Sequence, residues 1–369
     1  MLEQINKHLP ANRDKQRIAL IDGDIIKYRV GFASQTTLYR LYLTEKPEGY
    51  TGPVNPKIPL EFEGKTALND FIKKYELDSN FLYWEEQIVP DSIDKCLHSV
   101  KMTIERVQNS LQADQTQIFL SGKGNFREEV AQLLPYKGNR KDIAKPYHYQ
   151  DIHDYLVNVW NAKVVEGMEA DDALGIAQWH DFNQKLYKAF KEQPDDVNDY
   201  LKKNCKTFIV TLDKDLDMIP GWHYNWTKSD PSGADLGELY WVTQDQALKN
   251  FFSQVLSGDS VDNIPGIRGI GQKKALKALE GLTDAQSMYD KVLDKYIEWV
   301  ESWEDKLDDV VEEAERRMDE AAQLVWILRT NHEKGEVPYY HNTHMEVEPR
   351  VHNGKENTSV SRVSSVDDS

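Results

Sequence analysis

Acidic side chains recur in four short clusters, and clustered carboxylates predict chemistry more directly than any other feature of this sequence. The clusters are Asp22/Asp24, Glu169/Asp171/Asp172, Asp213/Asp215 and Asp259/Asp262. Carboxylates gathered in one crevice repel one another and need cations to hold them there. Oxygen ligands of this kind select Mg²⁺ or Mn²⁺, and two such ions can promote hydrolysis of a phosphodiester. Any one cluster alone is better explained as a solvated turn or a helix N-cap, but four together favour a metal site.

A glycine-rich stretch is the second signal. Residues 258–271 contain Pro265-Gly266 and Gly269-Ile270-Gly271, and Lys273, Lys274 and Lys277 follow. Glycine turns before a helix expose backbone N–H groups to a phosphate, and the lysines supply counter-charge. The alternative is an ordinary glycine-rich loop between two helices. The combination of turns and lysines favours phosphate binding.

Composition narrows the class of protein. Of the 369 residues, 40% are hydrophobic, which excludes global disorder, and no apolar run is long enough to span a membrane. The first residues lack the pattern of a signal peptide. The only cysteines, Cys96 and Cys205, are far apart, so we expect neither a disulfide framework nor a cysteine-based zinc site. These features predict a cytoplasmic protein.

The net charge of −17 argues at first against a nucleic-acid partner, but the charge is unevenly distributed. Residues 280–369 hold 22 acidic and 10 basic side chains, so the rest of the chain carries only −5. Within that remainder, 121–145 and 263–279 are locally basic. Local field matters more than total charge, so both segments are candidate phosphate sites.

Strands that alternate with helices should position these residues. Short apolar runs at 17–21, 117–120, 162–165 and 207–212 predict strands, and the pattern between them predicts helices. This alternation predicts an α/β fold with a parallel sheet, whose ligand crevice lies at the carboxyl ends of its strands. Asp22 and Asp213 fall at such ends.

Other segments are interpreted more simply. Residues 34–90 are expected to be an irregular insertion rather than a domain. Asn125 and Glu128 resemble a capping box that opens a helix. After residue 283 we expect acidic helices, and we expect 348–369 to be a disordered tail. The segment 302–328 should pack through one apolar stripe made of Leu307, Val310, Val311, Ala314, Met318, Ala321 and Val325.

Taken together, these motifs resemble the 5′-nuclease superfamily of flap endonucleases, in particular bacteriophage 5′-3′ exonucleases and the 5′-nuclease domain of bacterial DNA polymerase I. The similarity runs from about residue 17 to 280. It rests on Ile21-Asp22-Gly23, Phe126-Arg127, Tyr136-Lys137-Gly138-Asn139-Arg140, Glu169-Ala170-Asp171-Asp172, Thr211-Leu212-Asp213-Lys214-Asp215 and the stretch from Gly258 to Gly271. The resemblance implies a PIN-like parallel-sheet core with a helical arch and a C-terminal helix-three-turn-helix region.

The resemblance also implies roles for individual residues. Two Mg²⁺ or Mn²⁺ ions are expected, the first on Asp22, Glu169 and Asp171, the second on Asp172, Asp213, Asp215, Asp259 and Asp262. Lys137 and Arg140 are expected to contact the scissile phosphate. The residues implied to bind DNA, with a K⁺ ion in the helix-three-turn-helix, are Arg127, Tyr136, Arg268, Gly269, Gly271, Lys273 and Lys274.

The implied function is a 5′-3′ exonuclease or flap endonuclease that acts on duplex DNA or RNA–DNA hybrids, in phage replication or recombination. The implied division is a catalytic core at 17–215, a DNA-binding region at 216–282, an acidic helical extension at 283–347 and the tail. One departure concerns Ser121, where the family usually has an aspartate; Asp24 is close enough to compensate.

Two alternatives remain open: a DNA-binding member of the fold that has lost cleavage, and a haloacid-dehalogenase-like phosphatase that uses Asp22, Asp24, Asp213 and Asp217.

Overall fold

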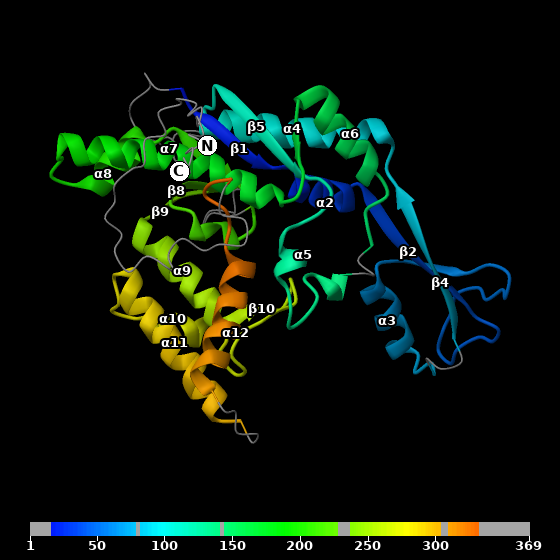
Figure 1. Cartoon of the computed structure of the whole chain (residues 1–369). Coiled ribbons are helices and arrows are strands. Elements are labelled where there is room, and N and C mark those ends of the chain that lie inside the picture. Colours follow the sequence, from blue (N-terminus) through cyan, green and yellow to red (C-terminus); the bar gives the residue numbers. More distant parts are fainter. Residues whose placement is uncertain (1–15, 79–81, 141–143, 228–236, 304–308, 332–369) are drawn as a thin grey trace, which may run out of the picture.

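A six-stranded sheet forms the centre of the molecule (Figure 1). The computed structural model describes residues 16–78, 82–140, 144–227, 237–303 and 309–331. The strand order is β6-β5-β1-β7-β8-β9, and all neighbours are parallel except the edge strand β9, which is antiparallel to β8. The strands are β1 (Ile18–Asp22), β5 (Gln115–Ser121), β6 (Lys163–Val165), β7 (Thr207–Val210), β8 (Gly221–Asn225) and β9 (Glu238–Val242). The predicted α/β fold with a parallel sheet is confirmed.

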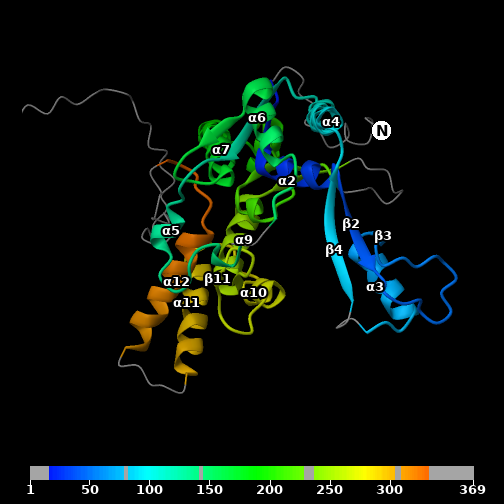
Figure 2. The same ribbon diagram turned by 90° about the vertical axis from the view of Figure 1, so that its right-hand side faces the viewer.

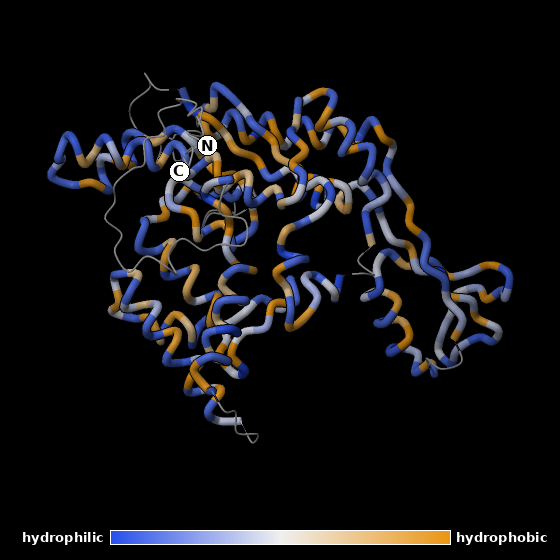
Figure 3. Tube along the Cα trace, in the orientation of Figure 1, coloured by the Kyte–Doolittle hydropathy of each residue, from blue (hydrophilic) through white to orange (hydrophobic). Residues whose placement is uncertain are grey.

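Alternate side chains of the central strands point to opposite faces, and helices cover both. Ala19 and Ile21 belong to the core under α2 (Gly23–Ala33), α4 (Ile93–Leu111) and α6 (Tyr149–Trp160). Leu20 and Ile209 belong to the core that includes the start of α7 (Ala170–Glu192) and α9 (Gln244–Ser257). A shorter helix, α8 (Val197–Asn204), packs beside α7. Hydrophobic segments accordingly gather along the central strands (Figure 3).

Gly23 lets α2 begin directly after β1. A Cβ atom at this position would lie 2.7 Å from the carbonyl oxygen of Phe119 and 2.7 Å from the side chain of Leu120. Only glycine permits this approach to β5, since backbone cannot move aside as a flexible side chain can. The close turn leaves Asp22 at the junction of strand and helix.

Residues 35–90, which we call the insertion module, form a folded unit that projects from the body (Figures 1 and 2). It contains β2 (Gln35–Tyr42), β3 (Leu60–Glu63), α3 (Lys65–Lys74) and β4 (Tyr83–Pro90), in an antiparallel sheet of order β3-β2-β4. Tyr39, Leu41 and Leu68 lie in its own small core. The expectation of an irregular insertion is therefore wrong.

The segment between β5 and α6 is less regular than expected. Its described residues contain only the single-turn helix α5 (Arg127–Val130) and a 3₁₀ turn at Gly138–Arg140. The side chain of Asn125 accepts the N–H of Arg127, but no longer helix follows it. The helical arch is thus not found in the described part of this segment, and the predicted capping box opens one turn at most.

The C-terminal helices belong to the main core. α11 (Ala285–Glu301) and α12 (Val310–Val325) pack on each other and on α9. The predicted stripe is confirmed for Ala314, Met318, Ala321 and Val325, which are buried, whereas Val311 is 46% exposed and Leu307 lies outside the described residues. The chain beyond α12 is also buried, at Trp326, Ile327, Leu328 and Arg329.

The predicted tail at 348–369 lies outside the described residues. Cys96 and Cys205 are both buried and form no disulfide bond. No helix in the described ranges combines the length and apolar character that a bilayer crossing requires.

Replacing Trp326 with Ala should lower the free energy of unfolding by about 3–5 kcal/mol, because the ring is buried and packs edge-on against Phe251 with centroids 5.0 Å apart. Val311→Ala, at the exposed start of α12, should change it by less than about 0.5 kcal/mol. Urea denaturation of both variants checks this. Equal losses would show that the segment after α12 does not carry core packing.

Candidate active site

A cleft of about 900 Å³ opens at the carboxyl edge of the parallel sheet. Acidic residues reach it from the ends of β1 and β7, from the start of α7, and from the loop joining β10 (Gly258–Asp259) to β11 (Ile264–Pro265). Seven of the eight predicted metal ligands line it, namely Asp22, Glu169, Asp171, Asp213, Asp215, Asp259 and Asp262. Lys137 and Arg140 line it as well. The four acidic clusters therefore share one site.

Asp22 is buried at the floor of this cleft and is held by three donors. One of its oxygens caps α2 by accepting the N–H groups of Asp24 and Ile25, at 3.0 and 3.1 Å. The other accepts the hydroxyl of Thr211 at 3.1 Å. Burial and the neighbouring carboxylates of Asp24 and Asp213 nevertheless raise the pKa of Asp22 to about 7.

The remaining carboxylates of the floor also repel one another. Burial, followed by the charges of Asp22 and Asp213, raises the pKa of Asp171 well above its ordinary value. Burial and the charge of Asp213 raise the pKa of Asp215 to about 7. Burial likewise raises the pKa of Asp213. Protonation would relieve this repulsion, and so would a bound cation.

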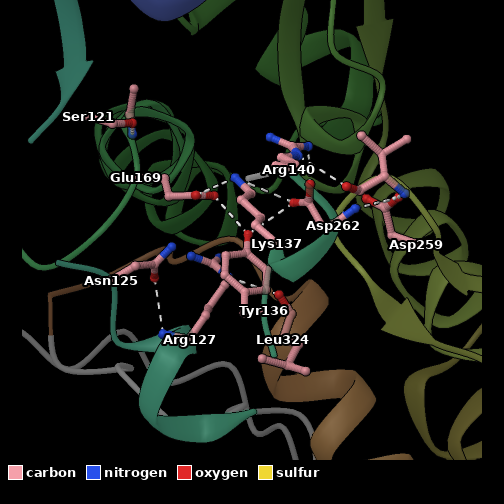
Figure 4. Close-up of polar contacts among 12 residues, drawn as sticks. Ser121, Asn125, Arg127, Tyr136, Lys137, Arg140, Glu169, Asp259, Asp262 and Leu324 are labelled. Carbon is pink, nitrogen blue, oxygen red and sulfur yellow. Dashed lines mark hydrogen bonds and ion pairs between the residues drawn. The ribbon is translucent and has the colours of Figure 1, made fainter. Parts of the chain in front are cut away.

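Residues 136–140 form the basic segment of the cleft. The side chains of Tyr136, Lys137 and Arg140 lie against acidic side chains of the cleft (Figure 4). Lys137 pairs with Glu169, and its ammonium group lies 3.6 Å from Asp262. Arg140 pairs with Asp262 and donates to the carbonyl oxygen of Val261 at 3.0 Å. The hydroxyl of Tyr136 lies 3.0 Å from both Glu169 and Asp262. These cations neutralise part of the negative charge of the cleft.

Asp172 does not belong to the cleft, contrary to its predicted role as a metal ligand. It is fully buried, and both of its oxygens pair with the guanidinium of Arg127 at 2.7 and 2.8 Å. They also accept the N–H groups of Glu169 and Leu328. The prediction that Arg127 binds DNA is wrong for the same reason, since its side chain is buried in this ion pair. The carboxylate of Asp172 outweighs the effect of burial and raises the pKa of Arg127.

Asp24 and Ser121, which also line the cleft, form a second polar link. Asp24 pairs with the buried Lys27 at 2.7 Å and accepts the N–H of Ser121 at 2.9 Å. The hydroxyl of Ser121 accepts the N–H of Ala170 at 2.9 Å, at the start of α7. Both oxygens of Asp24 are therefore already in use, which argues against the expectation that it replaces a missing metal ligand. The pair instead joins α2, β5 and α7.

The donor chemistry of the cleft fits a hard divalent cation, since its floor is made of carboxylate oxygens that destabilise one another. Within the described ranges, no three His, Cys, Asp or Glu side chains already converge as a metal cage. The ion pairs of Glu169 and Asp262 with Lys137 and Arg140 explain part of this separation. The cleft thus contains carboxylate oxygens that suit a divalent cation, but in the described structure they do not surround one position.

A second hollow, of about 520 Å³, lies along the glycine-rich loop. Arg268, Gly269 and Gly271 line it, and Lys273 and Lys274 are exposed on the following helix α10 (Gln272–Ala278). Gly258 has a φ of 65°, and a Cβ atom there would lie 2.3 Å from the nitrogen of Gly266, so the loop closes tightly on itself. Whether this α9–loop–α10 unit binds duplex DNA or K⁺ stays a prediction.

Several cleft residues were not predicted. Tyr28, Arg29 and Phe32 of α2 line it together with Tyr149. Tyr28, Arg29 and Phe32 follow Asp22 by about two to three helical turns, and this spacing was the available signal for them. Asp217, by contrast, does not line the cleft, and it accepts the hydroxyl of Tyr240 at 2.7 Å. Its separation from Asp22 argues against the phosphatase arrangement.

Adjacent aspartates should respond oppositely to mutation. Asp172→Ala should lower the free energy of unfolding by about 3–5 kcal/mol, because it leaves Arg127 buried without its partner. Asp171→Ala should stabilise the metal-free protein, since it removes repulsion from Asp22 and Asp213. Urea denaturation in a chelating buffer checks both. If Asp172→Ala left the free energy of unfolding unchanged but weakened Mg²⁺ binding, Asp172 would be a metal ligand after all.

No family model matches the chain. Its sequence is 30% identical over 188 residues to DNA polymerase I of Caldicellulosiruptor bescii, covering 46% of this chain and 19% of the polymerase. It is 24% identical over 288 residues to DNA polymerase I of Lactococcus lactis, covering 76% and 26%. It is 26% identical over 187 residues to a 5′-3′ exonuclease of Buchnera aphidicola, covering 47% and 52%. The matches thus span about half the length of these relatives or less.

Among solved structures, the T5 5′-exonuclease is similar with a TM-score of 0.42 and 15% identity, covering 84% of this chain and 88% of that one. The sequence similarity to DNA polymerase I and to a 5′-3′ exonuclease is in line with the resemblance that the acidic motifs carry.

Proposed function

We propose that this protein is a divalent-metal-dependent nuclease that hydrolyses phosphodiesters at 5′ ends or flaps of duplex DNA or of RNA–DNA hybrids. The observation that carries the proposal is the cleft that eight acidic side chains line together with Lys137 and Arg140. Carboxylates alone would repel a phosphodiester, so the cleft accepts one only when cations are present. Bound Mg²⁺ or Mn²⁺ ions would supply an activated water and stabilise the leaving oxygen.

Within this proposal, each side of the cleft has its own task. The residues that would hold the metal ions are Asp22, Asp171, Asp213 and Asp215 on the floor and Asp259 at the end of β10. Glu169 and Asp262 would join them once Lys137 and Arg140 turn toward the phosphate. The side chains of Lys137 and Arg140 would then orient the scissile phosphate and stabilise the charge that develops on it. Tyr136 would position the carboxylates rather than contact DNA.

The glycine-rich loop would hold the duplex. Its exposed Lys273 and Lys274 and its backbone N–H groups suit contacts with phosphates, which do not depend on base sequence. We keep the predicted division into a catalytic core at 17–215 and a DNA-binding region at 216–282 as a division of function. A role in primer removal or in resection of 5′ ends, in phage or cellular replication, is the corresponding biological proposal.

The runner-up is a DNA-binding member of the superfamily without cleavage. Two observations favour it: Ser121 provides no carboxylate, and Asp172 is committed to Arg127. Both reduce the number of oxygen donors in the cleft. The two readings agree on DNA binding and differ only in whether product forms.

Cleavage of a 5′-labelled flap duplex in Mg²⁺ should be lost in Asp213→Ala and should fall about 100- to 1,000-fold in Lys137→Ala, because each removes a group that acts on the phosphate or its metal ions. DNA binding should stay nearly intact. Asp154→Asn, at an exposed carboxylate on α6, is the matched control and should cleave normally. Binding without product would support the runner-up, and phosphate release from a monoester alone would support a phosphatase.

Changing Lys273 and Lys274 to Glu should weaken affinity for every duplex sequence tested and reduce the slope of log affinity against log salt by about 2, since each phosphate contact contributes about 0.9. A filter-binding titration at several salt concentrations measures both. The control is Lys188→Glu with Lys191→Glu, exposed near the far end of α7, which should leave affinity close to that of the parent. A loss confined to particular sequences would contradict backbone binding.

A further inference from the structure

The C-terminal helix α12 supports the backbone that leads into the basic segment of the cleft. Glu320 is buried, with only 6% of its surface exposed. Its Oε1 atom accepts the backbone N–H groups of both Gln132 and Leu133, at 2.8 and 2.7 Å. These two residues lie between α5 and Tyr136, outside any helix or strand. One carboxylate oxygen thus holds two successive N–H groups of an otherwise irregular segment.

The same region receives a second attachment from the C-terminal part of the chain. The carbonyl oxygens of Leu324 and Trp326 accept the guanidinium of Arg127, which in turn pairs with Asp172 of α7. Figure 4 shows Arg127 beside Leu324. Residues 320–326 therefore hold the segment at both Arg127 and Leu133. Both attachments are made by groups that do not reach the cleft.

Glu320 is an unusual choice for packing alone. A buried carboxylate is costly unless its oxygens are well paired, and within the described part of the chain the Oε2 atom of Glu320 has no hydrogen bond. The guanidinium of Arg316 lies 3.9 Å from it. The interaction made by the side chain is therefore concentrated on the two N–H groups, and hydrogen bonds to a charged acceptor are stronger than neutral ones.

Position along the chain connects this contact with the site. Tyr136 follows Leu133 by three residues, which span at most about 11 Å. The next residues, Lys137 and Arg140, make the ion pairs with Glu169 and Asp262. A shift of the backbone at 132–133 would therefore move the cations of the cleft.

We propose that Glu320 is a positioning residue that sets where Lys137 and Arg140 stand in the cleft. The inference rests on the proposed nuclease function, and Glu320 itself touches neither substrate nor metal. It assigns to the C-terminal extension, which the motifs of the superfamily do not explain, a role in the cationic half of the site.

The test compares Glu320→Ala, Glu320→Asp and Glu320→Gln in the full chain, with Glu315→Ala, exposed on the same helix, as the control. In the Ala and Asp variants, the kcat for cleavage of the flap duplex in Mg²⁺ should fall about tenfold or more. KM should change by less than about twofold, since the duplex is held elsewhere. Glu320→Gln keeps an acceptor at the same place and should restore most of the activity. The Asp variant, which shortens the side chain by one carbon, covers the case in which Ala does not fold.

A double-mutant cycle distinguishes positioning from general loss of stability. In a background that carries both Lys137→Ala and Arg140→Ala, Glu320→Asp should lower kcat by less than about twofold, because both groups that it positions are already gone. Losses that multiply, or a Glu320→Asp variant with the kcat of the parent, would overturn the inference and leave the proposed function standing. A parent chain that does not cleave would instead overturn the proposed function.

Discussion

Repulsion between carboxylates is the constraint around which the rest of this structure is arranged. Parallel strands end at one edge, so the residues that follow β1 and β7 meet there, and α7 and the β10–β11 loop add further acids. The pKa values of Asp22 and Asp215 are both raised to about 7, because these carboxylates are buried and repelled by their neighbours. Such a cluster persists only because the surrounding fold forces it to.

The surrounding polar contacts all reduce that cost. Thr211 and two backbone N–H groups hold Asp22, while Lys137 and Arg140 neutralise Glu169 and Asp262. Beneath the cleft, the ion pair of Arg127 and Asp172 ties the start of α7 to the residues after α12. The acidic site and the C-terminal helices are therefore connected by these contacts, although they are far apart in sequence.

The sequence predicted the sheet and the convergence of the clusters because both follow from local patterns. Apolar runs that end in Asp22 and Asp213 mark strand ends without any knowledge of the strands with which they pair.

The orientation of a side chain on a helix is harder to predict. Asp171 and Asp172 are neighbours in the motif, but successive residues on a helix are turned by about 100°, so one faces the cleft and the other the core. The partner of Asp172 is 45 residues away, and the two N–H groups held by Glu320 are nearly 190 residues away. The insertion module escaped prediction for a similar reason, since β2 pairs with a strand, β4, that is separated from it along the chain by β3 and α3.

The manner in which the insertion module joins the body has a consequence for its history. Gln35 and Pro90, its first and last residues, are paired across β2 and β4, and the N–H of Asp91 donates to the carbonyl oxygen of Ser34 at 2.9 Å. The chain thus leaves and re-enters the body at almost the same point. A unit attached in this way can be acquired, exchanged or deleted in a single genetic event without rerouting the sheet behind it. The central sheet and the insertion module can therefore change independently of each other.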